Sequence, residues 1–217
     1  MDTGTPIRRA IAGLAVIFVS WSVFVHAAEG IVASKSLTVL GAGPRQGSGG
    51  SNYFNIQGKN KEKYAGFGLL VFPLPKGDGN ADVKTLTLAF VQSIPAFSAD
   101  GKIKFYLAHP LDAEPSSLEK LKYDPTAAGG LAKDAFKSLQ ALGAGEFKKI
   151  ETGKSDTFVL SLDDMARDKL RSLLKTGGSL HIVVAPSDDD VAATYFGAGN
   201  ETEANRPRIT LAGETPK

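Results

Sequence analysis

The chain has 217 residues, a formal net charge of +2 at neutral pH and no cysteine. This length suits one domain with a substantial hydrophobic core. The near-neutral charge balance, without a dominant run of Lys or Arg, gives no electrostatic footprint for nucleic acid. The lack of cysteine excludes a disulfide framework, thiol catalysis and cysteine-based metal sites.

The N-terminal segment has the organisation of a secretory signal peptide. Arg8 and Arg9 precede an apolar run over 10–25, and small or aliphatic residues stand at the two positions of 25–27 that a signal peptidase reads. The run is somewhat shorter than the ~20 residues of a spanning helix, which favours cleavage over an uncleaved anchor. We therefore expect a secreted, periplasmic or cell-surface protein that contacts a membrane only through this segment, if uncleaved. The expected division is a signal peptide over 1–27 and a single domain over 28–217.

Several segments alternate apolar and polar residues with the two-residue period of a half-buried strand. In 83–91 the alternate apolar side chains share one face, and in 102–107 the apolar side chains point inward while the lysines point outward. The Gly-rich segment 41–51 is predicted to be a loop. The predicted strands are 36–40, 52–57, 64–73, 83–91, 102–107, 157–162, 180–184, 191–196 and 207–211.

Two helices are predicted between these strands. Asp163 can cap a helix over 164–175, whose apolar residues form one stripe, and a Gly-Gly pair ends it. A second helix is predicted over 131–141 from the spacing of Leu131, Phe136 and Leu139. Many short strands with few helices predict a mostly β fold, namely an antiparallel β-sandwich, jelly-roll-like, with two short helices.

Four segments also carry a resemblance to a known family. The chain resembles DNRLRE-type domains, which are jelly-roll modules of secreted bacterial and archaeal proteins related to carbohydrate-binding modules. The resemblance spans most of 33–212, but a Gly/Ala/Lys-rich stretch replaces the family's Trp-containing middle segment. It implies an extracellular binding or structural module and no particular ligand. The matching segments are the apolar strand with its Pro-containing turn at 69–75, the strands at 83–88 and 101–107, and the closing Arg-Pro strand at 205–211.

One acidic turn has the spacing of a calcium loop. Asp78, Asn80 and Asp82 alternate along the chain, so their side-chain oxygens can converge on a hard cation. Val83 and Ala89 stand where an EF-hand loop has Gly and Glu, and a polar turn between strands is the alternative. Calcium is therefore the one cofactor that the sequence suggests.

Other motifs are interpreted as structural. The glycines of 39–47 look like a dinucleotide fingerprint, but that site needs a helix directly after them, and Gly and Ser residues followed by a strand are expected instead. The run Ser187–Asp190 is interpreted as a solvated loop tip. His109 is placed in a loop and His181 on the outer face of a strand, and two histidines so far apart define no zinc site.

Aromatic side chains near loops or strand ends can stack on sugar rings. Phe97, Tyr123 and Tyr195 are the candidates, and the lack of Trp outside the signal segment weakens such a platform. No Gly-x-Ser-x-Gly elbow is present. We therefore expect a non-catalytic extracellular binding module for a polysaccharide or a cell-surface component. The alternatives are a structural or matrix protein that binds another protein, and a secreted hydrolase with paired carboxylates, whose separation is a three-dimensional property.

Overall fold

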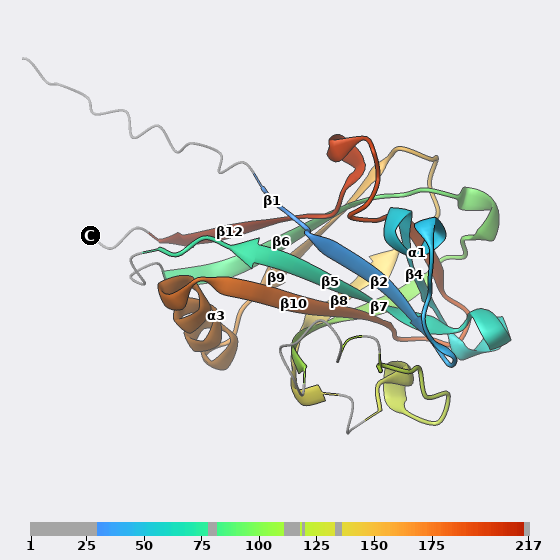
Figure 1. The fold of residues 1–217 in the computed structure, drawn as a ribbon, viewed down its shortest axis with the longest axis horizontal. Helices are drawn as coiled ribbons and strands as arrows, with labels where there is room; N and C mark the ends of the chain where they lie inside the picture. Colours follow the sequence, from blue (N-terminus) through green and yellow to red (C-terminus); the bar gives the residue numbers. More distant parts are fainter. Residues whose placement is uncertain (1–29, 78–81, 111–117, 119, 133–135, 215–217) are drawn as a thin grey trace, which may run out of the picture.

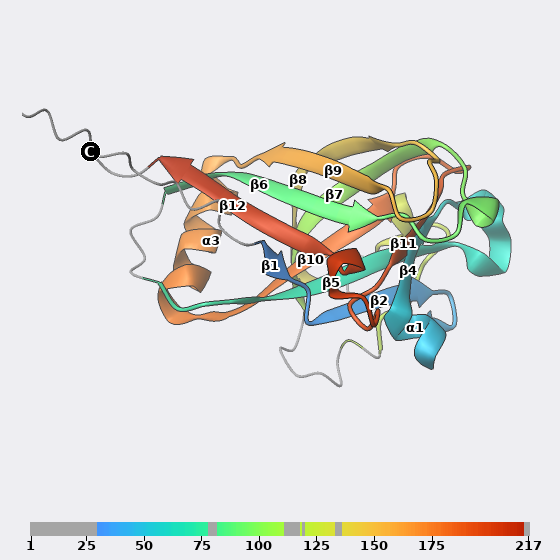
Figure 2. The same ribbon diagram turned by 90° about the horizontal axis from the view of Figure 1, so that it is seen from above.

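The protein is a mostly β structure in which two antiparallel sheets face each other (Figure 1; Figure 2). The computed structural model describes residues 30–77, 82–110, 118, 120–132 and 136–214. The expected signal peptide and most of the acidic turn lie outside the described residues. Within them, the predicted antiparallel β-sandwich is confirmed.

The smaller sheet has four strands in the order β1-β12-β6-β9, and the larger sheet has eight. In the larger sheet the order β11-β4-β5-β10-β7-β8 forms the main path, and β2 pairs with both β5 and β3. The strands of the smaller sheet are β1 (Ile31–Val32), β12 (Arg208–Glu214), β6 (Asp82–Val91) and β9 (Ser155–Ser161). Those of the larger sheet are β2 (Lys35–Leu40), β3 (Gly43–Pro44), β4 (Tyr53–Gln57), β5 (Gly66–Leu74), β7 (Gly101–Pro110), β8 (Phe136–Phe147), β10 (Gly178–Pro186) and β11 (Ala192–Phe196).

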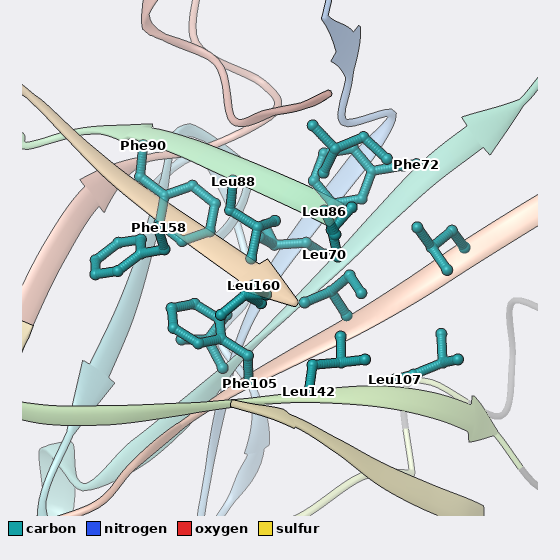
Figure 3. Close-up of a cluster of buried hydrophobic side chains, with 14 of the residues drawn as sticks. Leu70, Phe72, Leu86, Leu88, Phe90, Phe105, Leu107, Leu142, Phe158 and Leu160 are labelled. Atoms are coloured by element: carbon teal, nitrogen blue, oxygen red, sulfur yellow. The ribbon is translucent and has the colours of Figure 1, made fainter. Parts of the chain in front are cut away.

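The main core lies between the two sheets, as Figure 3 shows. Alternate residues of each strand enter it, because successive side chains of a strand point to opposite faces. Leu86, Leu88 and Phe90 of β6 thus face Phe105 and Leu107 of β7, and all five are buried.

A second apolar cluster covers the outer face of the larger sheet. Leu121 and Leu131, from the segment between β7 and β8, pack in one cluster with Phe67, Leu69 and Val183 of the sheet. Because β5 is buried on both faces, its sequence is a continuous apolar run and does not alternate.

Short helices complete the structure. At one end of the sandwich α3 (Asp164–Thr176) packs against β6 and β10 (Figure 1). The predicted cap is confirmed, because the Asp163 carboxylate accepts a hydrogen bond from the Ala166 amide at 2.8 Å. The other helical segments are α1 (Ser48–Asn52) and the 3-10 turns η1 (Lys59–Tyr64), η2 (Pro95–Phe97), η3 (Ala128–Gly130) and η4 (Glu203–Asn205).

Two predictions of local structure are wrong. The segment 131–141, predicted as a helix, contributes its described C-terminal part to strand β8, which pairs with β7 over ten residue pairs. The segment 41–51, predicted as a loop, contains β3 and most of α1. The nine predicted strands are all present, with ends that differ by a few residues.

Candidate functional site

A pocket of about 290 Å³ lies where β2, β3 and α1 meet the loop after β11. We call it the β2–α1 pocket. The strand β2 contributes Lys35 and Leu37, the turn between β3 and α1 contributes Arg45 and Gln46, and the loop after β11 contributes Ala198. Cationic, amide and apolar surfaces therefore meet in one hollow.

Two glycines give the turn between β3 and α1 its shape. Gly47 has φ of 76°, in the left-handed region that favours glycine. A Cβ atom on Gly50 would clash with the backbone carbonyl oxygen of Arg45, so only glycine lets α1 fold back so closely on this turn. The Gly50 amide donates to the Gly47 carbonyl oxygen at 2.9 Å. The Gly-rich sequence is therefore required for the wall that carries Arg45.

Hydrogen bonds join three segments of the pocket wall. The Ser36 hydroxyl donates to the Ser51 carbonyl oxygen at 3.3 Å and accepts from the Ala198 amide at 2.8 Å. The Gly199 amide also donates to the Ser51 carbonyl oxygen, at 2.9 Å. Since β2, α1 and the loop after β11 are bonded to one another here, the pocket is a defined part of the fold.

The pocket carries two positive charges. Lys35 is partly buried and Arg45 is exposed. With the Asn55 amide oriented to satisfy both of its polar atoms, its oxygen accepts from Arg45 Nη1 at 3.3 Å and its nitrogen donates to the Phe54 carbonyl oxygen at 3.0 Å. None of the lining residues is acidic or a histidine. The pocket can thus bind a polar or anionic ligand.

The three predicted sugar-stacking residues lie in different environments. Phe97 lies on η2 with 69% of its surface exposed. Tyr123 is buried in the outer apolar cluster, and Tyr195 is buried in the main core, where its ring stacks on Phe54 at a centroid distance of 5.2 Å. The structure does not gather these rings on one surface, and the two buried ones offer no free face to a sugar. None of the three lines the β2–α1 pocket.

The predicted calcium turn is described only at its last residue. Asp78 and Asn80 lie outside the described residues, and Asp82 begins β6. The Asp82 carboxylate accepts hydrogen bonds from Arg167 at 2.7 and 2.8 Å and from Arg171 at 3.2 Å, which ties β6 to α3. The bond from Arg167 lowers the pKa of Asp82. No group of three potential metal-binding residues occurs in the part of the chain that the structure describes, and calcium binding by the turn stays a prediction.

A partly buried polar network was not anticipated from the sequence. Asp156 on β9 accepts hydrogen bonds from the Gln92 amide at 2.7 Å and from the Tyr195 hydroxyl at 2.8 Å. Gln92 also donates to the Lys148 carbonyl oxygen and accepts from the Ile150 amide. Burial raises the pKa of Asp156, while the bonds from Gln92 and Tyr195 lower it. The only sequence signals were Gln92, directly after the predicted strand 83–91, and Asp156, directly before the predicted strand 157–162. Polar residues are common at such strand ends.

The structure also corrects three smaller interpretations. His109 lies in strand β7 and not in a loop. The helix α1 does follow the glycines of 39–47, but the surrounding strands are antiparallel and form no βαβ unit, so the fingerprint interpretation stays rejected. The acidic run after β10 is bonded and not merely solvated, because Asp188 accepts from the Lys102 amide and Asp189 pairs with Lys59.

Comparison with known proteins adds no relative. A scan against models of known families finds no match, and a search of curated proteins finds no significant similarity. In the described ranges, none of the helices has the length and apolar character needed to cross a membrane.

Proposed function

We propose that the protein is a non-catalytic extracellular binding module that holds one sugar unit of a polysaccharide in the β2–α1 pocket. The observation that carries the proposal is the mixed lining of this pocket. Sugars present hydroxyl groups around a ring with apolar C–H faces. Gln46 and Arg45 offer hydrogen-bonding groups, while Leu37, Pro44 and Ala198 offer apolar contact.

The size of the pocket supports a single unit. A volume of about 290 Å³ lies at the lower end of the range for small-molecule sites, roughly 300–1,000 Å³. A pocket of this size suits one ring at a chain end or on a branch. The resemblance to DNRLRE-type domains is consistent with this role and stays a prediction.

The test is calorimetric titration of the purified protein with a panel of polysaccharides and oligosaccharides, with calcium and with a chelator. The variant Gln46→Trp places a bulky ring in the pocket and should abolish binding. The variant Phe97→Ala removes the exposed aromatic ring elsewhere and should leave binding unchanged. Loss of binding only in Phe97→Ala would move the site to η2, and no binding to any glycan would reject the proposal.

A second candidate function, assembly with another protein, has one observation in its favour. Val159 lies on the edge strand β9 of the smaller sheet and is 67% exposed. Exposed edge strands can pair with a strand of another chain. A structural or matrix role predicts concentration-dependent assembly in sedimentation experiments that the variant Val159→Lys suppresses. A protein that stays monomeric at all concentrations and captures no partner strand would reject this role.

A further inference from the structure

We infer that the β2–α1 pocket selects a sugar unit that carries a tetrahedral oxyanion, that is, a phosphate or sulfate ester. This inference rests on the function proposed above and names the class of ligand. It begins from Lys35 and Arg45, which line the same pocket from different elements.

Some surface cations of the described residues have acidic partners, and these two do not. Lys59 pairs with Asp189 at 2.8 Å, and Arg167 pairs with Asp82 at 2.7 Å. Over the residues that the structure describes, neither Lys35 nor Arg45 forms an ion pair. Two unpaired positive charges beside a lining without acidic residues give the pocket a positive potential, which attracts anions.

The Arg45 guanidinium lies against two neighbouring segments. Its Nη1 donates to the Asn55 amide oxygen, and its Nη2 lies 3.6 Å from where a Cβ atom on Gly49 would stand, so it lies along α1. One donor of the guanidinium is engaged, and its remaining donors can form the paired hydrogen bonds that arginine makes with phosphate and carboxylate oxygens.

The arrangement favours a tetrahedral anion over a planar carboxylate. Lys35 comes from β2, whereas Arg45 comes from the turn after β3, so the two cations belong to different walls. The three free oxygens of a phosphate or sulfate ester point in different directions and can meet two cations and a hydroxyl group together. A carboxylate has two oxygens in one plane, which a single arginine satisfies.

The experiment compares four ligands that share one ring. Glucose 6-phosphate, glucose 6-sulfate, glucuronate and glucose are titrated separately into the full protein by calorimetry and by NMR at low salt. We expect at least one of the two esters to bind about tenfold more tightly than glucuronate or glucose, since charge-assisted hydrogen bonds are roughly twice as strong as neutral ones. This binding should weaken at high salt, because ionic screening reduces attraction between exposed charges.

Three variants locate the binding. Lys35→Gln and Arg45→Gln should each weaken ester binding by about tenfold more than they weaken glucose binding, which corresponds to about 1.4 kcal/mol. Arg45→Lys keeps the charge but loses the planar fork, so it should weaken binding less. The control Lys104→Gln removes a charge from the exposed face of β7, which β5 and β10 separate from β2, and should have no effect.

The outcomes separate the inference from the function beneath it. Binding of glucuronate as tight as that of the esters, or equal binding of all four ligands, would overturn the inference and leave the proposed function standing. No binding of these ligands or of any glycan in the panel would reject both. Binding of glucose 6-phosphate should strengthen between pH 5 and 7.5, because the second pKa of a phosphate is near 6. Binding of glucose 6-sulfate should not depend on pH in this range.

Discussion

At the scale of single residues, the pocket depends on a glycine that no side chain can replace. A Cβ atom on Gly50 would clash with the Arg45 carbonyl oxygen, whereas one on the neighbouring Gly49 would meet its nearest heavy atom only at 3.6 Å. Both glycines lie in α1, where alanine is favoured over glycine by up to about 1 kcal/mol.

We therefore predict opposite effects for two identical substitutions. Gly50→Ala should lower the free energy of unfolding by about 1–3 kcal/mol, because the backbone must shift. Gly49→Ala should leave it unchanged or raise it slightly. Urea unfolding followed by circular dichroism measures both. Equal effects of the two substitutions would show that the turn rearranges freely. The glycine at position 50 would then not be required for the pocket wall that carries Arg45.

At the scale of elements, α3 closes one end of the sandwich with a narrow apolar stripe. Leu170 is buried against the main core, whereas Met165 on the same helix is 69% exposed. The helix is also fixed by Asp163 at its N-terminus and by the contact of Arg167 with Asp82. The buried side chain of Leu170 and the surface bonds of Asp163 and Arg167 therefore both hold α3 in place.

The prediction for this element compares two truncations. Leu170→Ala should destabilise the protein by about 2–5 kcal/mol, as truncations of buried leucines do. Met165→Ala removes a side chain of similar size from the exposed face and should change stability by less than about 0.5 kcal/mol. Thermal unfolding of both variants gives the comparison. A small loss for Leu170→Ala would mean that α3 contributes little to the core.

The elements also show where sequence reasoning succeeds and fails. The cap and stripe of α3 are local, so the sequence predicts this helix and its first residue. Strand β8 has no such local signal. Its buried residues Phe136, Leu142 and Phe147 are spaced irregularly, because register shifts interrupt its pairing with β7. With the two-residue period lost, the spacing of Phe136, Leu139 and Leu142 imitates a helix. The pocket was missed because it forms from segments that are far apart in the sequence.

At the scale of the whole molecule, the two ends of the sandwich differ in chemistry. One end is covered by α3 (Figure 2). Gln92, directly after the other end of β6, forms a polar network with Asp156 and Tyr195. Burial raises the pKa of Asp156, whereas hydrogen bonds from Thr126 lower the pKa of the exposed Asp124. The two carboxylates therefore affect global stability with opposite dependence on pH.

For Asp156, the folded protein holds the proton to a higher pH than the unfolded chain does. Its contribution to stability is complete below the unfolded pKa of about 3.9 and is lost as the pH rises through the folded pKa. The variant Asp156→Asn, which stays neutral, should thus be more stable than the wild type at pH 7, and the difference should vanish towards pH 3. Asp124→Asn, the control, should be less stable than the wild type at pH 7, again converging in acid. Urea midpoints from pH 3 to 8 measure both, and a destabilised Asp156→Asn at pH 7 would show that the bonds from Gln92 and Tyr195 outweigh the cost of burying the charge.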